Sequence, residues 1–265
     1  MVRFIRRHIC VAAALTAACA AAVPASAVTL AEMQGRGEVR IGVLTGSPPN
    51  GMIDENGNPT GYDVDVAAVV GRYLALPVKL VPLTPPARIP ALQTGQVDFL
   101  IATLAPTGER AKTVMFTTPY SAFDLVVVTA PDKTFGKPDD LKGKRVAVNR
   151  GSSQEAALRR AAIPGLEIVV YEDDSTATQA VLAGQVDAAV IPSTVAQGVV
   201  KQMPGAMKID FSFFRQGNSM ATLPGDFELH QYLNTAIYVM KVSGELDRIS
   251  VKWTGEPLPP QLPTF

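Results

Sequence analysis

The stretch PLTPPARIPALQTGQVDFLIATLAPTGERAKTVMFTTPY, residues 82–120, carries the clearest signals of the fold. Within it, residues 90–94 have the pattern of the last turns of a helix, and Gly95 follows where a helix end often needs a positive φ. Val97–Leu104 is an apolar run of strand length, and Pro106 lies just beyond it. A helix, a glycine and a buried strand in this order predict an α/β sheet, whose ligands bind beyond the C-terminal ends of the strands.

Arg110 follows the predicted strand in a polar loop or a first helical turn. A guanidinium near free backbone N–H groups at this edge of a sheet is suited to clamp a carboxylate. The alternative is a solvated charge beside Glu109 and Lys112. Thr103 at the end of the strand offers a hydroxyl or backbone group to a ligand, or else faces another side chain of the sheet.

Two stretches of the chain recur in the same order. VRIGVLTGS (39–47) is similar to KRVAVNRGS (144–152), and ALQTGQVDFLIA (91–102) is similar to AVLAGQVDAAVI (180–191). Each copy reads as a strand, a glycine-containing turn, helices, and then helix, glycine and strand. Repeated supersecondary units predict two lobes of similar build with mostly parallel sheets.

Several motifs together resemble a known family. VDFLIATLAPTGERAK with FTTPY is similar to the bacterial family 3 solute-binding proteins, the periplasmic receptors of polar amino-acid ABC transporters. The resemblance continues in GYDVDV (61–66), LKGKRVAV (141–148), GSSQE (151–155) and KWTGEPLPP (252–260). It implies an α/β, two-lobed periplasmic-binding-protein fold of type II, with each lobe a mostly parallel sheet flanked by helices, and two hinge crossings.

The domain boundaries follow from the repeat and the resemblance. We expect a signal peptide at 1–27, the first part of lobe 1 at 28–130, lobe 2 at 131–212, and the return to lobe 1 with C-terminal helices and a proline-rich tail at 213–265. The crossings are expected near Thr129–Asp132, where Pro131 breaks an apolar run, and near Asp210–Gln216.

The first 27 residues predict export to the periplasm. Arg3, Arg6 and Arg7 precede the apolar stretch Ile9–Val23, and a small-x-small cleavage site ends at Ala27. Cleavage there removes three of 24 basic residues and no acidic residue, so the mature charge is 21 minus 24, or −3. A nucleic-acid partner is therefore not expected.

Both cysteines, Cys10 and Cys19, lie in the predicted signal peptide, so no disulfide is expected in the mature chain. The alternative makes Cys19 a lipidated N-terminus. No later segment is long and apolar enough to span a membrane.

The resemblance also implies roles for individual residues. Arg110 corresponds to the arginine that holds the ligand's α-carboxylate, and Ser152 and Ser153 open a helix whose N–H groups hold the same carboxylate. Arg88 lies in ARIPAL, which resembles the glutamate/aspartate-binding subgroup, where this arginine takes a distal carboxylate. The alternative for Arg88 is a solvent-facing position at a helix start.

The departures from the family pattern bear on the ligand. The aspartate that usually takes the ligand's ammonium is replaced by Pro192, and Ser47 and Pro85 stand where aromatic walls are usual. Ser47 is expected among the residues that bind the ligand. Two alternatives remain. Either another residue, with Asp174 as the candidate, binds the ligand's ammonium, or the ligand is an acid without an ammonium. Asp174 with Asp173 can equally form a solvated turn. We expect a small carboxylate ligand with a second carboxylate or a distal acceptor.

The expected function is the binding component of an amino-acid-type ABC transporter, a monomer that delivers its ligand to an inner-membrane permease. Neither a metal-ligand cluster nor a phosphate loop occurs, so no metal or cofactor is expected. One alternative is an enzyme similar to cyclohexadienyl dehydratase, with Glu109, Glu172 or Asp174 as the acid. Another is a receptor that docks on a sensor instead of a permease.

Overall fold

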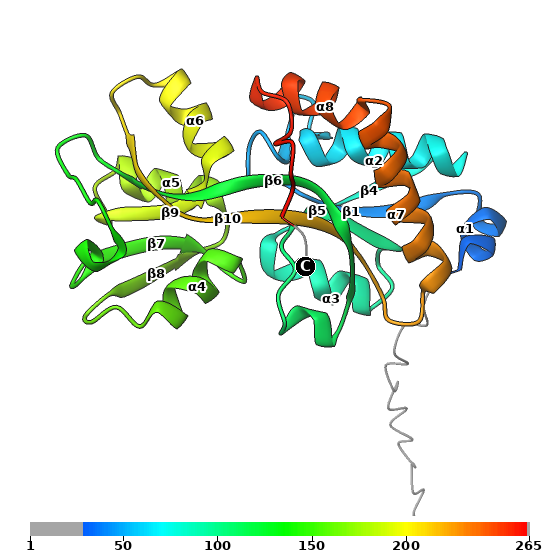
Figure 1. Cartoon of the computed structure of the whole chain (residues 1–265), viewed down its shortest axis with the longest axis horizontal. Helices are drawn as coiled ribbons and strands as arrows, with labels where there is room; N and C mark the ends of the chain where they lie inside the picture. The colour runs from blue at the N-terminus through cyan, green and yellow to red at the C-terminus, as the bar shows by residue number, and fades with distance from the viewer. Residues whose placement is uncertain (1–28, 264–265) are drawn as a thin grey trace, which may run out of the picture.

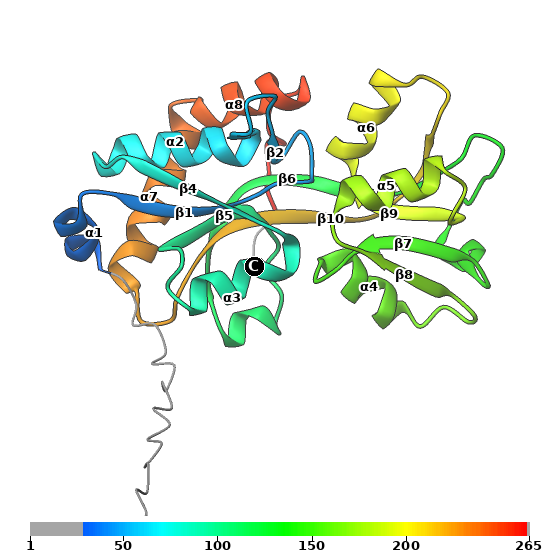
Figure 2. The ribbon, with the colours of Figure 1, turned by 180° about the vertical axis from the view of Figure 1, so that it is seen from behind.

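Two long strands run through the middle of the chain and belong to both halves of the molecule. The computed structural model describes residues 29–263, and in it β6 (Met115–Thr129) and β10 (Lys208–Thr222) pair along almost their whole length. Figures 1 and 2 show one group of elements at each end of these strands. The predicted signal peptide lies outside the described residues.

Lobe 1 contains the N-terminal elements and the C-terminal helices. Its elements are α1 (Leu30–Arg36), β1 (Val39–Leu44), β2 (Met52–Ile53), β3 (Pro59–Thr60), α2 (Tyr62–Leu74), β4 (Val78–Leu83), η1 (Pro85–Ala87), α3 (Arg88–Gln93), β5 (Phe99–Leu104), η2 (Arg110–Lys112), α7 (Phe227–Val242) and α8 (Glu245–Thr254). Lobe 2 contains η3 (Pro138–Leu141), β7 (Arg145–Asn149), α4 (Ser153–Ala161), β8 (Glu167–Tyr171), α5 (Asp174–Leu182), β9 (Ala188–Pro192) and α6 (Ser193–Gln202).

The eight main strands form one hydrogen-bonded order, β4-β1-β5-β10-β6-β9-β7-β8. The prediction of two separate sheets is wrong in this respect, because the crossings are strands and not loops. β5 pairs with the Ser219–Ala221 part of β10, whereas β9 pairs with the Leu125–Thr129 part of β6. The ladder is continuous, but its two halves lie at opposite ends of β6 and β10 (Figure 1).

The chain therefore crosses between the lobes inside β6, before the predicted position. Thr129 already pairs with Ala188 in lobe 2, so the loop after it cannot be the crossing. The stretch between the two ends is 120–124 in β6 and 215–218 in β10. The break at Pro131 marked the end of the strand instead of the end of the lobe, because an extended strand continues through a hinge without any turn residue.

The internal repeat is confirmed and has a structural cause. β1 lies between β4 and β5 with parallel pairing, and β7 lies between β8 and β9 in the same way. In each lobe the aspartate of the GQVD motif bonds the first strand: Asp98 accepts from the N–H of Arg40 at 2.7 Å, and Asp187 accepts from the N–H of Arg145 at 2.9 Å. The GQVD aspartate thus ties its own strand to the first strand of the same lobe, and the motif has a structural role.

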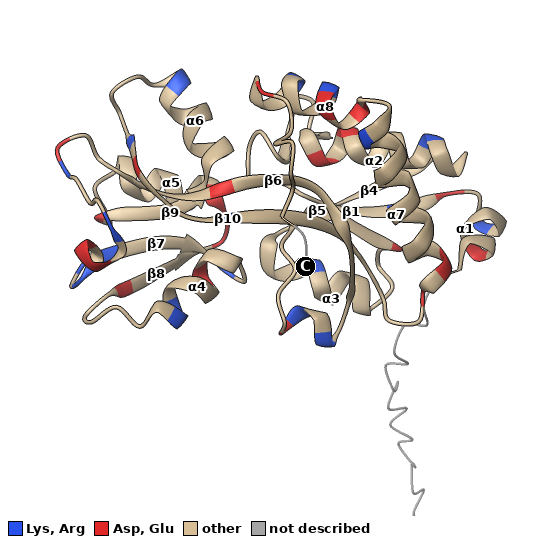
Figure 3. Ribbon diagram, viewed as in Figure 1, with Lys and Arg blue, Asp and Glu red and all other residues tan. Residues whose placement is uncertain are grey.

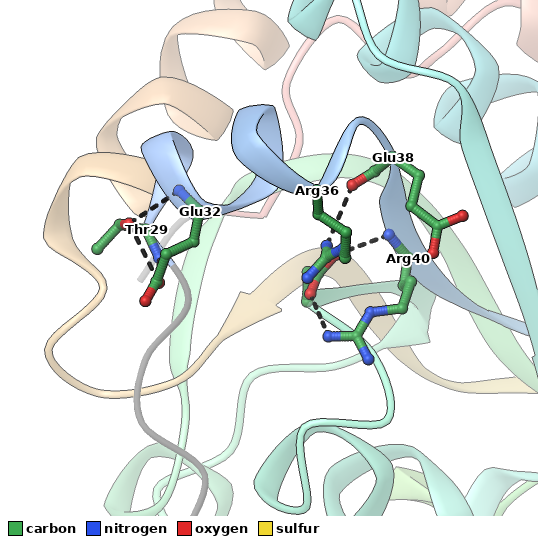
Figure 4. A network of polar contacts seen from close by, with 6 residues as sticks. Thr29, Glu32, Arg36, Glu38 and Arg40 are labelled. Atoms are coloured by element: carbon green, nitrogen blue, oxygen red, sulfur yellow. Dashed lines mark hydrogen bonds and ion pairs between the residues drawn. The ribbon is translucent and has the colours of Figure 1, made fainter.

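The N-terminal helix is joined to this structure by a polar network (Figure 4). Thr29 and Glu32 form a capping box at the start of α1, and Arg36 at its end bonds the carbonyl of Glu38. Arg36 also forms an ion pair with the buried Asp98. The helix is thereby held at the start of β1.

Each lobe has its own hydrophobic core. Two clusters of buried side chains fill lobe 1 and two fill lobe 2, one on each face of the sheet. Charged residues gather on the helices and connections, and few lie on the strands (Figure 3). None of the helices within residues 29–263 is long and apolar enough to cross a bilayer.

The proline-rich tail after α8 lies along the surface. It runs back over β6 toward β10 (Figure 1), and Pro263 reaches the Gly217 region of the hinge. Leu258 packs against the lobe 1 core, so the tail is attached to lobe 1.

Candidate functional site

A narrow polar cavity lies between the lobes, at the C-terminal ends of β5, β7 and β9. The predicted residues that line it are Arg88, Thr103, Arg110, Ser152, Ser153 and Asp174. The centre of a water-sized sphere can occupy only about 20 Å³ of this space. One water molecule needs about 10–15 Å³ by that measure. The lobes must therefore separate before a ligand of amino-acid size can enter.

Arg110 lies in η2, directly after the loop that follows β5, and its guanidinium reaches across the cavity. Nη1 donates to the carbonyl of Ala105 at 2.7 Å, and Nη2 donates to the carbonyl of Gly151 in lobe 2 at 2.8 Å. Burial lowers the pKa of Arg110 to about 10, so it is protonated at neutral pH. Glu109 pairs with Lys112 instead, and Arg110 is not the solvated charge of the alternative interpretation.

Arg88 is buried and every bonded group around it is a backbone carbonyl. Nε donates to Pro85 at 2.9 Å, and Nη1 donates to Ala102 at 3.0 Å and Thr103 at 3.1 Å. Nη2 is 3.4 Å from the carbonyl of Gly151. Burial, followed by the charge of Arg110, lowers the pKa of Arg88 to about 9. The solvent-facing alternative for Arg88 is thus excluded, and a ligand carboxylate would have to share this arginine with the main chain.

Thr103 directs its hydroxyl away from the cavity. Its φ of 50° turns the chain at the end of β5, and Oγ1 donates to the buried Asp63 at 2.5 Å. Tyr120 donates to the same carboxylate at 2.7 Å and accepts from the Thr103 N–H at 3.1 Å. Burial raises the pKa of Asp63 to about 7. This arrangement holds the turn whose carbonyls bond Arg88.

Asp174 is the acidic residue that lines the cavity. It is 2% exposed, and it accepts from Ser47 Oγ of lobe 1 at 2.6 Å and from Gln154 Nε2 at 3.3 Å. Burial raises the pKa of Asp174 to about 7, while the Ser47 hydrogen bond and Arg88 act in the opposite direction. The solvated-turn interpretation fits Asp173, which caps α5, and does not fit Asp174.

Ser152 and Ser153 lie at the start of α4, as the GSS sequence predicts. Ser152 is the N-cap and accepts from the Glu155 N–H at 3.1 Å. Ser153 donates to Gln216 of the hinge strand β10. Gln216 was missed by the sequence analysis, because nothing in a strand sequence indicates which residue faces the space between two lobes.

Other cavity residues were missed as well. Asn149 and Gln154 contribute amides from lobe 2, and apolar contacts come from Leu44, Phe123, Leu125 and Pro192. The position of Asn149 was accessible to reasoning, because it ends the second copy of the repeated strand, as Leu44 ends the first. Pro192 does line the cavity, at the predicted place of the missing aspartate.

Several hydrogen bonds join the rims of the two lobes beside the cavity. The Gly46 carbonyl accepts from the Ser175 N–H at 3.1 Å and from its hydroxyl at 3.0 Å. Asn50 Nδ2 donates to Thr194 Oγ1 at 2.9 Å. With the bonds of Ser47 and Arg110, these contacts hold the cavity shut.

Two α/β lobes that share two strands and enclose a polar cavity define a periplasmic binding protein of type II. Residues 39–256 match the model of the bacterial extracellular solute-binding proteins, family 3. The chain belongs to this family.

Relatives and solved structures agree with that assignment. The L-cystine-binding protein TcyJ of Escherichia coli K12 is 29% identical over 229 residues, covering 85% of this chain and 86% of that protein. An ancestral arginine-binding protein bound to glutamine is 36% identical with a TM-score of 0.78, covering 83% of this chain and 99% of its own. The ancestral amino-acid-binding protein AncCDT-1, a precursor of cyclohexadienyl dehydratase, is 32% identical with a TM-score of 0.79, covering 85% and 99%.

The ligands named for these relatives can be compared with the ligand expected from the sequence. Amino-acid binding is common to these relatives, as expected, and other relatives are named as amino-acid-binding components of ABC transporters. The expected likeness to glutamate/aspartate receptors is not confirmed, since cystine, arginine and glutamine are the ligands named. Within residues 29–263, no group of three or more His, Cys, Asp or Glu side chains is placed to hold a metal ion.

Proposed function

We propose that this chain is the periplasmic substrate-binding component of an ABC transporter, and that it closes on a small carboxylate ligand of amino-acid type. The observation that carries the proposal is Arg110, whose guanidinium faces the cavity and bonds the Gly151 carbonyl across it. A carbonyl oxygen is a weak substitute for a carboxylate, which binds a guanidinium through two charge-assisted bonds. The ligand's carboxylate would take the place of that carbonyl.

The charges around the cavity favour an anionic group. Two arginines and one aspartate line it, and the aspartate has a pKa near neutrality. Arg88 adds positive potential even though its N–H groups bond carbonyls. A zwitterionic amino acid fits if Asp174 takes the ammonium, and a dicarboxylate without an ammonium fits if Asp174 is protonated.

The ligand is expected to close the two lobes because each lobe forms one wall of the cavity. Arg110 belongs to lobe 1, whereas Asp174 and the start of α4 belong to lobe 2. A ligand that contacts both walls binds the closed state better and shifts the population toward it. The closed lobes would then dock on an inner-membrane permease, and the binding protein would act as a monomer.

A thermal-shift panel tests this proposal. It contains aspartate, glutamate, their deaminated dicarboxylates, cystine, and neutral and basic amino acids. A bound ligand raises the unfolding midpoint by an amount that follows RT ln(1 + [L]/Kd). We expect stabilisation by carboxylates with a second acceptor. Stabilisation by basic amino acids alone would contradict the ligand class, and stabilisation by none of them would contradict the function.

Asp174 supports one second candidate, an enzyme of the dehydratase kind. A buried carboxyl with a raised pKa in a cleft can act as a general acid. Glu109 and Glu172 are exposed and do not line the cavity, so Asp174 is the remaining candidate among the three. Incubation with prephenate or arogenate decides the matter: product that appears with the wild type and is absent with Asp174→Asn would establish an enzyme.

A further inference from the structure

Asn149 presents an amide to the ligand cavity from the lobe 2 side. It is the last residue of β7, it is 4% exposed, and it lines the cavity. Its main chain pairs with Tyr171 of β8, which fixes the start of its side chain. Arg110 lies on the other lobe, so a ligand held there would extend toward this amide.

The neighbouring hydrogen bonds determine which way the Asn149 amide points. Gln154 Nε2 donates to Asn149 Oδ1 at 2.7 Å and to Asp174 Oδ1 at 3.3 Å. The amide nitrogen of Gln154 thus faces both Asn149 and Asp174, and an amide nitrogen only donates. The Asn149 atom that accepts from it is the oxygen, and Nδ2 is the atom left over.

Nδ2 of Asn149 is a donor without an acceptor. None of the hydrogen bonds among residues 29–263 uses it, although the rest of the side chain is bonded and buried. Nδ2 is also not one of the fully enclosed side-chain atoms that lack a partner within these residues, so it opens to the cavity, where a ligand oxygen can reach it. The cavity therefore contains one unmet donor on the wall that faces Arg110.

We propose that Asn149 determines specificity by donating from Nδ2 to an oxygen on the side chain of the ligand. This inference rests on the proposed function, in which Arg110 holds the first carboxylate. It assigns the ligand to carboxylates that carry a second acceptor, such as a carboxylate or carboxamide oxygen. A basic side chain offers only donors and would meet the Asn149 donor unfavourably.

The bond forms only when lobe 2 closes on the ligand, so it contributes to selection among ligands that Arg110 already holds. A site built to bond a polar group rejects the analogue that lacks it more strongly than an apolar pocket rejects an extra group. Asn149 would thereby take the role that the sequence predicted for Arg88, whose N–H groups bond main-chain carbonyls.

Calorimetry with four probes tests the inference: L-glutamate, L-glutamine, L-norvaline, which lacks the side-chain acceptor, and L-ornithine, which carries a donor. We expect the wild type to bind L-glutamate or L-glutamine at least about 10-fold tighter than L-norvaline. Asn149→Leu should bring that ratio close to one and leave L-norvaline within about 3-fold. Asn149→Asp should weaken L-glutamate further and improve L-ornithine. Asn56→Asp, in the exposed turn before β3, is the matched control and should change nothing.

The outcomes separate this inference from the proposed function. If the wild type binds these probes through Arg110 but Asn149→Leu keeps the wild-type ratio, the inference alone is overturned. A wild type that prefers L-norvaline or L-ornithine overturns it too, and one that binds no probe overturns both. Should the variants not fold, the Asn149 side-chain ¹⁵N resonance of the wild type must shift on saturation with the tightest probe, and an unchanged resonance would refute the contact.

Discussion

The two walls of the cavity use different chemistry. Lobe 1 contributes two guanidinium groups whose positions are fixed by main-chain carbonyls, and lobe 2 contributes amides, hydroxyls and one carboxylate. A guanidinium fork suits any carboxylate, whereas neutral amides and a carboxyl near its pKa distinguish one ligand from another. The comparison indicates that lobe 1 holds what all ligands of the site share and that lobe 2 selects among them.

Within lobe 1, the two arginines also differ from each other. Arg110 bonds one carbonyl of its own loop and one of the opposite lobe, so opening the lobes frees part of its fork. Arg88 bonds three carbonyls of lobe 1, which opening leaves intact, and opening removes only its long contact of 3.4 Å to the Gly151 carbonyl. We therefore propose that Arg110 binds the ligand and that Arg88 supports the β5 turn, and mutagenesis can test this division of roles.

The largest effect is expected for Arg110→Ala, which should abolish ligand binding. The loss should be roughly 2–5 kcal/mol, because the ligand's carboxylate would remain buried without its partner. Arg110→Lys should restore little, since an ammonium lacks the planar fork. Calorimetry with the tightest probe of the thermal-shift panel measures the loss. A change below about 1 kcal/mol would mean that Arg110 does not hold the ligand's carboxylate.

Arg88→Ala should reduce stability more than Arg110→Ala does. It leaves three lobe 1 carbonyls without their donor and Asp63 without a nearby positive charge, so we expect a loss on the order of 3 kcal/mol. Chemical denaturation of the ligand-free protein measures it, with Arg110→Ala as the matched control. Equal losses for the two variants would remove the division of roles.

The sequence predicted the elements better than the way they are joined. The strand predicted at Val97–Leu104 is observed as β5 (Phe99–Leu104), and its end was predicted to the residue because the apolar run stops just before Pro106. The first crossing was placed too late, near Thr129–Asp132 instead of 120–124 in β6, because an extended chain has the same local pattern inside a lobe and between lobes. The return crossing expected near Asp210–Gln216 overlaps the observed stretch 215–218 of β10. α6 was missed, and Pro192 directly before it was interpreted only as a lost ligand contact.

In the candidate site, too, the sequence predicted positions better than contacts. Arg110 and Asp174 both line the cavity, and the sequence marked them by their positions after a strand end and at a helix start. The hydroxyls of Thr103 and Ser47 were expected at the ligand, and both instead bond buried carboxylates. Such partners lie far apart along the chain, so only tertiary packing reveals them.

Asp174 makes stability depend on pH in a defined direction. Its pKa rises from 3.8 to about 7 on folding, so between those values the folded chain keeps a proton that the unfolded chain has lost. Stability must therefore fall as pH rises through this window. Asp63 shifts in the same direction, so Asp174→Asn should reduce the slope and not abolish it. Denaturation midpoints at pH 5 and pH 7.5 measure the slope, and an unchanged slope would show that Asp174 does not titrate there.

The smallest effect concerns the rim, where Asn50 of lobe 1 bonds Thr194 of lobe 2. This bond exists only when the lobes are closed, so Asn50→Ala should lower the closed population and not the stability of either lobe. A single neutral hydrogen bond contributes about 0.5–1.5 kcal/mol, which corresponds to roughly a 2- to 12-fold weaker apparent affinity. Thr194→Ala should give the same loss, and the double variant should lose no more than either single variant, because the two side chains act as one pair. Calorimetry with one probe measures all three, with Asn56→Ala as the control. Additive losses would show that the two residues act separately and that the rim does not hold the cavity closed through this bond.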